Sequence, residues 1–232
     1  MNEKARKEVL IVDDEPRMCE SLRDQFTDCN EEANCPYEFE VDVALSAAEC
    51  VKKVRSKNAG AGKLPYDVIV LDIRMEEEKS GLEASSALHQ QLGWEAPVRI
   101  IFTGFPSYRQ CVEAIHHGAW DYIVKEDVGV TLAAQIVVDS ALARLQQIDL
   151  RQEQERRIAE DWLPRRLREL QEEYGGQFVA LWDEEEVAVI ASGRDTFELE
   201  TRLKDWRKQH KYWEQPMVVL IPPQRGEPEQ EV

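Results

Sequence analysis

The first part of the chain, up to about Lys125, alternates short apolar runs with amphipathic stretches. Five runs rich in β-branched and aromatic residues are expected to form strands: Val9–Val12, Phe39–Leu45, Val68–Leu71, Arg99–Phe102 and Tyr122–Val124. Helical patterns begin near Pro16, Ser46, Leu82 and Pro106, each with apolar positions three or four residues apart. This alternation predicts an α/β fold with a doubly wound, five-stranded parallel sheet covered on both faces.

Beyond Gly129 the pattern becomes that of one long helix. Thr131 can cap a helix that runs without Gly or Pro to Leu163, longer than a crossover helix of such a sheet requires. Its apolar positions follow coiled-coil spacing at Val138, Ala141, Leu145 and Ile148. The next two positions of this seam are polar. We therefore expect a helical linker along which two chains could pair over part of its length.

The residues after this helix have the pattern of a small α+β domain. Pro164 is expected to begin a helix that ends at Gly175-Gly176, and Asp195 with Glu198 resembles the capping box of a second helix. Strands are predicted at Phe178–Trp182, Val187–Ala191 and Met217–Ile221. The expected division of the chain is therefore a first domain at 1–130, an extended helix at 131–163, a small α+β domain at 164–222 and a disordered tail at 223–232.

Composition excludes several classes of protein. With 232 residues, 43% hydrophobic and 32% charged, the chain can bury a sizeable core, which excludes wholesale disorder. A formal charge of −17 argues against a surface that follows a nucleic-acid backbone or an anionic membrane. No apolar run approaches the roughly 20 residues of a membrane helix, and the charged N-terminus lacks a signal-peptide pattern. We expect a cytoplasmic protein with no membrane partner.

The five cysteines are scattered and lack the close paired spacings of a zinc site: Cys19, Cys29, Cys35, Cys50 and Cys111. We expect reduced thiols, as in most cytoplasmic proteins. Cys29 and Cys35 could meet across a short loop, so a structural or regulatory disulfide between them is left open.

Polar residues follow four of the predicted strands at one edge of the sheet. Asp13 and Asp14 end the first strand, Asp72 ends the third, Thr103 the fourth and Lys125 the fifth. Three converging carboxylates repel one another unless a cation joins them, and hard oxygen ligands suit Mg²⁺. One carboxylate of such a site can act as nucleophile toward a phosphoryl donor, while the ammonium and the hydroxyl neutralise the charge of the phosphoryl oxygens.

Four segments carry a resemblance to a known family: Leu10–Pro16 (LIVDDEP), Val70–Met75 (VLDIRM), Ile101–Gly104 (IFTG) and Asp121–Lys125 (DYIVK). Together they resemble the receiver domain of two-component response regulators, a flavodoxin-like fold, over roughly the first 145 residues. The resemblance implies that a sensor histidine kinase or a phosphotransfer protein is the partner.

The resemblance also implies roles for single residues. Asp72 would be the phosphoacceptor; Asp14, Asp72 and the Arg74 carbonyl would bind Mg²⁺, and Asp13 would hold the metal through water. Thr103 and Lys125 would assist the reaction, and Thr103 with Tyr122 would form the switch pair. Such a receiver is no conventional turnover enzyme, since it catalyses only its own aspartyl phosphorylation and dephosphorylation.

Two features depart from the usual pattern of this family, and a third concerns the loss of the phosphoryl group. Glu76–Lys79 stands before Gly81, which makes this loop longer and more acidic, and Glu126 replaces the proline that usually follows the lysine. Arg74 and Phe105, two residues beyond Asp72 and Thr103, are both bulky and stand near the approach of hydrolytic water in the family. They predict slow autodephosphorylation.

The small C-terminal domain is expected to be an interaction module with a protein partner that the sequence does not identify. Residues 160–221, notably Tyr174–Ala180 and Ala191–Gly193, resemble a small domain family whose activity is not established. A homodimer through the 131–163 helix or a receiver face is a second route of output.

The alternative output is binding of RNA or single-stranded nucleic acid, duplex DNA being disfavoured because no helix-turn-helix pattern is evident. Basic and aromatic residues interleave at Arg202, Lys204, Trp206, Arg207, Lys208, Lys211, Tyr212 and Trp213. However, residues 151–232 contain 13 basic and 19 acidic residues, a net charge of −6. Enzymatic activity of the C-terminal domain is the weakest hypothesis, because its sequence shows no acid–base pair and no activated nucleophile.

Overall fold

The computed structural model describes residues 4–57, 65–75, 80–92, 97–125, 130–183, 187–210 and 215–223. The chain divides into two compact units, Met1–Gln147 and Ile148–Val232. Several predicted features lie outside the described residues, namely the acidic insertion 76–79, Glu126, the hairpin turn 184–186, the aromatic and basic residues 211–213, and the tail from 224.

The first unit contains the predicted five-stranded parallel sheet, which confirms the fold class. Its strands are β1 (Ala5–Val12), β2 (Tyr37–Ala44), β3 (Val68–Leu71), β4 (Val98–Thr103) and β5 (Asp121–Val124). They pair in the order β2-β1-β3-β4-β5, every pair parallel. The order reverses beside β1, so the carboxyl ends of β1 and β3 meet at the switch point where such sheets bind ligands.

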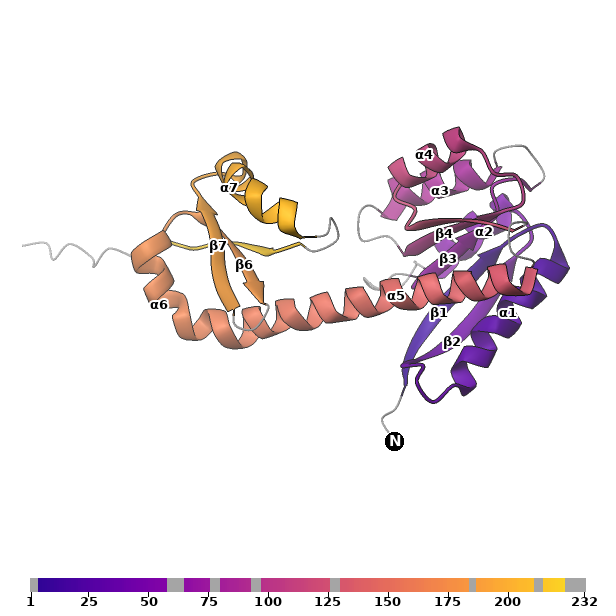
Figure 1. The fold of residues 1–232 in the computed structure, drawn as a ribbon, viewed down its shortest axis with the longest axis horizontal. Coiled ribbons are helices and arrows are strands. Elements are labelled where there is room, and N and C mark those ends of the chain that lie inside the picture. Colours follow the sequence, from indigo (N-terminus) through magenta and orange to yellow (C-terminus); the bar gives the residue numbers. More distant parts are fainter. Residues whose placement is uncertain are drawn as a thin grey trace, which may run out of the picture. The chain divides into compact units, whose positions relative to one another are not determined.

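Helices cover both faces of this sheet (Figure 1). They are α1 (Pro16–Glu31), α2 (Ala47–Lys57), α3 (Ser80–Leu92), α4 (Tyr108–His116) and the first part of α5 (Val130–Arg157). Helices α2, α3 and α4 share one core with alternate residues of the strands, such as Leu10, Ile69 and Ile101. Helix α1 starts at Pro16, whose missing N–H costs nothing in a first turn, and buries an apolar stripe that includes Leu22 and Phe26.

A buried arginine lies within the apolar strand β4. Arg99 is 2% exposed, and its guanidinium donates hydrogen bonds to the carbonyl oxygens of Ser85 at 3.0 Å and Gly118 at 3.2 Å. Burial lowers the pKa of this group. Because each carbonyl belongs to a different segment, the side chain joins α3 to the turn that follows α4.

The first half of α5 is part of the core of the first unit. Val138 and Ala141 are fully buried and Leu145 is 2% exposed within a single chain. These positions repeat with coiled-coil spacing because they face the core of their own unit. The predicted seam is therefore already buried within one chain and is not available for pairing with a second chain. Although α5 has 28 residues, neither it nor another helix in the described ranges is long and apolar enough to cross a bilayer.

The chain stays helical through Pro164, where the sequence predicted a new helix. Helix α5 ends at Arg157, a π-helical turn η2 (Ile158–Trp162) follows, and α6 (Leu163–Tyr174) begins directly after it. Proline has no N–H to donate to the preceding turn, and a wider turn accommodates this loss. The N–H of Leu163 accordingly reaches back to the carbonyl oxygen of Ile158.

The second unit contains a small α+β arrangement, as the predicted fold class requires. Its remaining elements are β6 (Phe178–Asp183), β7 (Val187–Gly193), α7 (Thr196–Gln209) and β8 (Met217–Leu220), and its antiparallel sheet has the order β7-β6-β8. Val179 and Leu181 face a core shared with η2 and α6, whereas Ala180 faces α7. As predicted, the Asp195 carboxylate caps α7, accepting a hydrogen bond from the Glu198 N–H at 2.8 Å.

Candidate phosphoacceptor site

Backbone hydrogen bonds continue past the strand ends and bring the polar residues to one edge of the sheet. The Asp72 N–H donates to the Val12 carbonyl oxygen at 2.9 Å, and the Lys125 N–H donates to the Thr103 carbonyl oxygen at 2.9 Å. Asp13 directly follows Val12. Residues that are far apart in the sequence therefore meet at the carboxyl ends of β1, β3, β4 and β5.

Lys125 is the centre of this group of side chains. Its ammonium donates hydrogen bonds to Asp13 Oδ2 at 2.7 Å and Asp72 Oδ2 at 2.6 Å. The exposed fractions are 8% for Lys125, 1% for Asp13 and 5% for Asp72. Burial lowers the pKa of the Lys125 ammonium, but the two carboxylate charges outweigh burial and raise it above its ordinary value. Lys125 therefore remains charged and holds both acids.

Three carboxylates exceed what one lysine can neutralise. One oxygen from each of Asp13, Asp14 and Asp72 lies within 4.8 Å of the others, and Asp14 is exposed to solvent. Burial raises the pKa of Asp13, and the Asp72 charge adds to this, despite the opposing effect of Lys125. A compact set of carboxylate oxygens open to solvent on one side is the donor set that a hard divalent cation such as Mg²⁺ prefers.

Thr103 and Tyr122 lie on neighbouring strands next to this cluster. Thr103 is fully buried, and its hydroxyl oxygen accepts a hydrogen bond from the Phe105 N–H at 3.2 Å. The half-buried Tyr122 hydroxyl oxygen accepts from the Ser107 N–H at 3.3 Å, and burial raises the pKa of this phenol. Both side chains thus contact the loop that leads from β4 into α4.

Two features of the site were missed by sequence reasoning, and the first is a close approach at Gly81. A Cβ atom on Gly81 would lie 1.8 Å from the Asp72 carbonyl oxygen, and the Gly81 N–H donates to the Ile73 carbonyl oxygen at 3.0 Å. Only glycine fits where the start of α3 touches the backbone after β3. The sequence marks Gly81 as the glycine that follows the acidic insertion, but it does not show that the start of α3 lies against the Asp72 backbone.

The second feature is a contact between Arg74 and Phe105. The Arg74 guanidinium lies over the Phe105 ring, and the Arg74 N–H donates to Asp72 Oδ1 at 3.2 Å. The bulk of both residues is visible in the sequence, but their stacking depends on the distance between two loops.

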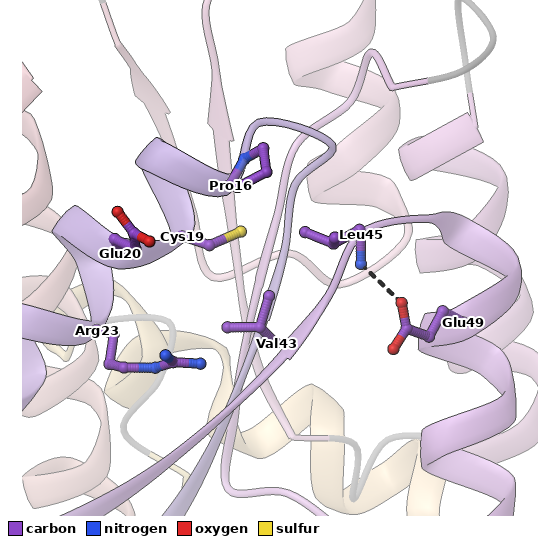
Figure 2. Close-up of a pocket in the computed structure, with 7 residues that line it drawn as sticks. All are labelled: Pro16, Cys19, Glu20, Arg23, Val43, Leu45 and Glu49. Atoms are coloured by element: carbon purple, nitrogen blue, oxygen red, sulfur yellow. Dashed lines mark hydrogen bonds between the residues drawn. The ribbon is translucent and has the colours of Figure 1, made fainter.

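A cavity of about 330 Å³ opens between α1 and the end of β2 (Figure 2). It is lined by Pro16, Cys19, Glu20, Arg23, Val43, Leu45 and Glu49. Glu49 Oε2 accepts a hydrogen bond from the Leu45 N–H at 2.9 Å and so joins α2 to the end of β2. None of the three clustered carboxylates lines this cavity.

The sequence profile of the response regulator receiver domain matches residues 9–136, more than half of the chain. The chain therefore belongs to the response regulator receiver domain family, as the four motifs indicated. It is a response regulator of two-component signalling. The profile ends within α5, so it does not describe the second unit.

The chain is also similar to several solved structures, three of which follow. A CheY-like receiver domain protein from Methanospirillum hungatei is 21% identical, with 62% of this chain and 99% of that chain covered and a TM-score of 0.46. The receiver domain of the Francisella response regulator 1452 is 22% identical over 60% and 98%, with a TM-score of 0.44. The phosphorylated cyanobacterial phytochrome response regulator RcpA is 17% identical over 57% and 89%, with a TM-score of 0.46. No curated protein matches the chain.

Proposed function

We propose that Asp72 accepts a phosphoryl group from a histidine kinase or phosphotransfer protein and that the resulting change leaves the receiver through α5. The observation that carries the proposal is the bridge that Lys125 makes between Asp13 and Asp72. It places a permanent positive charge against the carboxylate that ends β3. The same bridge would neutralise a phosphoryl oxygen on Asp72.

In this reaction a carboxylate oxygen of Asp72 forms a bond to phosphorus while the bond to the donor nitrogen breaks. Lys125 would move from the carboxylate to the phosphoryl oxygens, and the Thr103 hydroxyl would contact them from β4. We propose that Asp14 and Asp72, with the Arg74 carbonyl, hold Mg²⁺ and that Asp13 holds it through water. The metal would supply positive charge to the phosphoryl oxygens.

The test is intact-mass measurement of the full-length protein after incubation with acetyl phosphate. We expect one phosphoryl group per chain with Mg²⁺, none with a chelator, and none in Asp72→Asn. Asp28→Asn, which changes an exposed aspartate of α1, is the matched control and should be phosphorylated normally. Phosphorylation of Asp72→Asn at the wild-type level would refute the assignment.

Two contacts support α5 as the route of output. The Ser140 hydroxyl on α5 donates to Asp121 Oδ2 at 2.7 Å, and the Arg144 guanidinium lies 4.5 Å from the centre of the Trp120 ring. Both partners directly precede Tyr122 in the chain, and Asp121 is the first residue of β5, so a movement of this strand would displace α5. We propose that the second unit is an interaction module that responds to this displacement.

Nucleic-acid binding by the second unit finds no support in the contacts of α7. Arg202 pairs with Glu198, Arg207 with Glu200 and Lys208 with Asp205. These basic residues are neutralised within their own helix. They provide no excess positive charge for a phosphate backbone.

Light scattering of the full-length protein tests the output. Mass is measured with Mg²⁺, with and without beryllofluoride as a mimic of phosphorylated Asp72, and Asp72→Asn is the control. A change in mass that is lost in Asp72→Asn would place output in self-association. A constant mass, with beryllofluoride binding reported by tryptophan fluorescence, would place output in a separate partner protein.

A further inference from the structure

Two buried thiols face each other at the end of α1 that is remote from the acidic cluster. Cys29 lies in the last turn of α1 and Cys35 in the loop before β2, and each is 5% exposed. Their sulfur atoms are 2.7 Å apart, with both cysteines free. A disulfide bond is about 2.05 Å long, so the sulfurs need to approach by only about 0.7 Å to form one.

The backbone around the two cysteines already has the closed shape that a disulfide needs. The Glu32 N–H donates to the Cys29 carbonyl oxygen at 3.2 Å, and the Cys35 N–H donates to the Glu32 carbonyl oxygen at 3.3 Å. Lys4 holds the same turn, since its ammonium donates to the carbonyl oxygens of Asn30 at 2.6 Å and Glu32 at 2.9 Å. The loop between the cysteines is therefore closed before any covalent bond exists.

Exposed residues stand next to the buried thiols in the chain. Glu31–Asn34, which lie between the two cysteines, are all exposed to solvent. Burial, with the neighbouring Cys35, raises the pKa of the Cys29 thiol, so Cys29 is protonated while it stays buried. A small oxidant would reach the buried sulfurs through a local opening of this short segment.

We propose that Cys29 and Cys35 are a modification site that forms a reversible intramolecular disulfide when the protein meets hydrogen peroxide. One sulfur attacks a peroxide oxygen, the O–O bond breaks, and a sulfenic acid and water form. The second sulfur then attacks the sulfenic sulfur, the S–O bond breaks, and a second water leaves. The two thiols lose two electrons in total, and the peroxide is reduced to two waters. A dithiol reductant restores both thiols by exchange.

The disulfide would join the end of α1 to the segment that enters β2. It closes a loop of only seven residues, Cys29 to Cys35, so the expected effect on stability is moderate. Loop-closure entropy predicts that oxidation lowers the unfolding equilibrium constant of the receiver by about 50-fold.

The experiment treats full-length protein with hydrogen peroxide, unfolds it, alkylates the remaining thiols and digests it with a glutamate-specific protease. This protease cuts at Glu31 and Glu32, between the two cysteines, so only a disulfide can keep the two peptides together. We expect a linked Cys29–Cys35 peptide pair and three alkylated cysteines, reversed by dithiothreitol, with a raised urea midpoint of the oxidised receiver.

Two variants distinguish a specific Cys29–Cys35 disulfide from unspecific oxidation of cysteines. Cys35→Ser should yield no linked pair and no peroxide-dependent rise in urea midpoint, whereas Cys111→Ser, at a partly exposed position of α4, should behave as wild type. The proposal is overturned if Cys29 and Cys35 remain alkylatable at a peroxide dose that oxidises Cys111. A linked pair that joins Cys29 to Cys19 or Cys50 would overturn it equally.

Discussion

The Arg74 guanidinium carbon lies 4.1 Å from the centre of the Phe105 ring. The backbone N–H of Arg74 binds Asp72 Oδ1, and that of Phe105 binds the Thr103 hydroxyl, each at 3.2 Å. The stacked pair therefore joins the loops after β3 and β4 directly beside the proposed phosphoacceptor.

Removal of this pair should speed loss of the phosphoryl group. In Arg74→Ala with Phe105→Ala, water gains access in line with the bond between Asp72 and phosphorus, and the phosphoryl half-life should fall on the order of tenfold. The half-life is measured by intact mass after the phosphodonor is removed. Tyr108→Ala, at an 88% exposed side chain nearby, is the control and should leave the half-life unchanged. An unchanged half-life in the double variant would contradict the role of the stack.

Gly81→Ala should disrupt the site although it adds a single methyl group. The new Cβ would lie 1.8 Å from the Asp72 carbonyl oxygen, so α3 or the Asp72 backbone must move, and the receiver should lose about 2 kcal/mol of stability. Phosphorylation by acetyl phosphate should slow in parallel.

Gly104→Ala is the matched control for this change. Its Cβ would meet only the Lys125 side chain, at 3.9 Å, an ordinary contact distance. Urea denaturation of both variants measures the difference. Equal stability of the two variants would contradict this prediction, because it would show that the start of α3 moves to accommodate the added methyl group without cost.

Stability should depend on pH through Asp42. Burial raises the pKa of this carboxyl, but hydrogen bonds from Lys57 and Tyr66 outweigh burial and lower it below its ordinary value of 3.8. The ionised form therefore stabilises the folded state above about pH 4, and this contribution is lost as the pH falls through the lowered pKa.

Asp42→Asn should cost about 1 kcal/mol at pH 7, because both Lys57 and Asp42 are partly exposed, and less as the pH falls below 4. The asparagine oxygen can still accept the Tyr66 hydroxyl, so the variant tests the charge alone. Urea denaturation at pH 7 and pH 3 measures the change. Glu40→Gln, in an exposed pair with Arg6, is the control with a smaller expected effect. A deficit that stays equal at both pH values would contradict the assignment.

The second unit should depend on the contact between Arg157 and Asp183. Asp183 is 4% exposed and pairs with Arg157, while its carbonyl oxygen accepts the Gln154 side chain at 3.1 Å. Arg157→Ala leaves a buried carboxylate without its cation and should destabilise this unit by about 2 kcal/mol, since the arginine is half exposed. Hydrogen exchange of β6 amides measures the loss. Arg165→Ala, which removes a solvent-exposed pair with Asp161, should change protection little.

The sequence alone determined the fold class of both units and the set of residues at the carboxyl edge of the sheet. Apolar runs with strand spacing and amphipathic helices are local patterns, and each of the five predicted strands is present. Asp13, Asp72, Thr103 and Lys125 could be placed because parallel strands must end at the same edge. Asp195 could be placed as a helix cap because capping involves residues three positions apart.

The tertiary structure decided the features that depend on distance between segments. Val138 and Leu145 repeat as in a coiled coil, but a period of this kind does not distinguish a partner helix from the protein's own core. The stack of Arg74 on Phe105, the contact of Gly81 with Asp72 and the approach of Cys29 to Cys35 each join residues from separate elements or loops. Local propensity contains no information on such separations, because packing of the whole unit sets them.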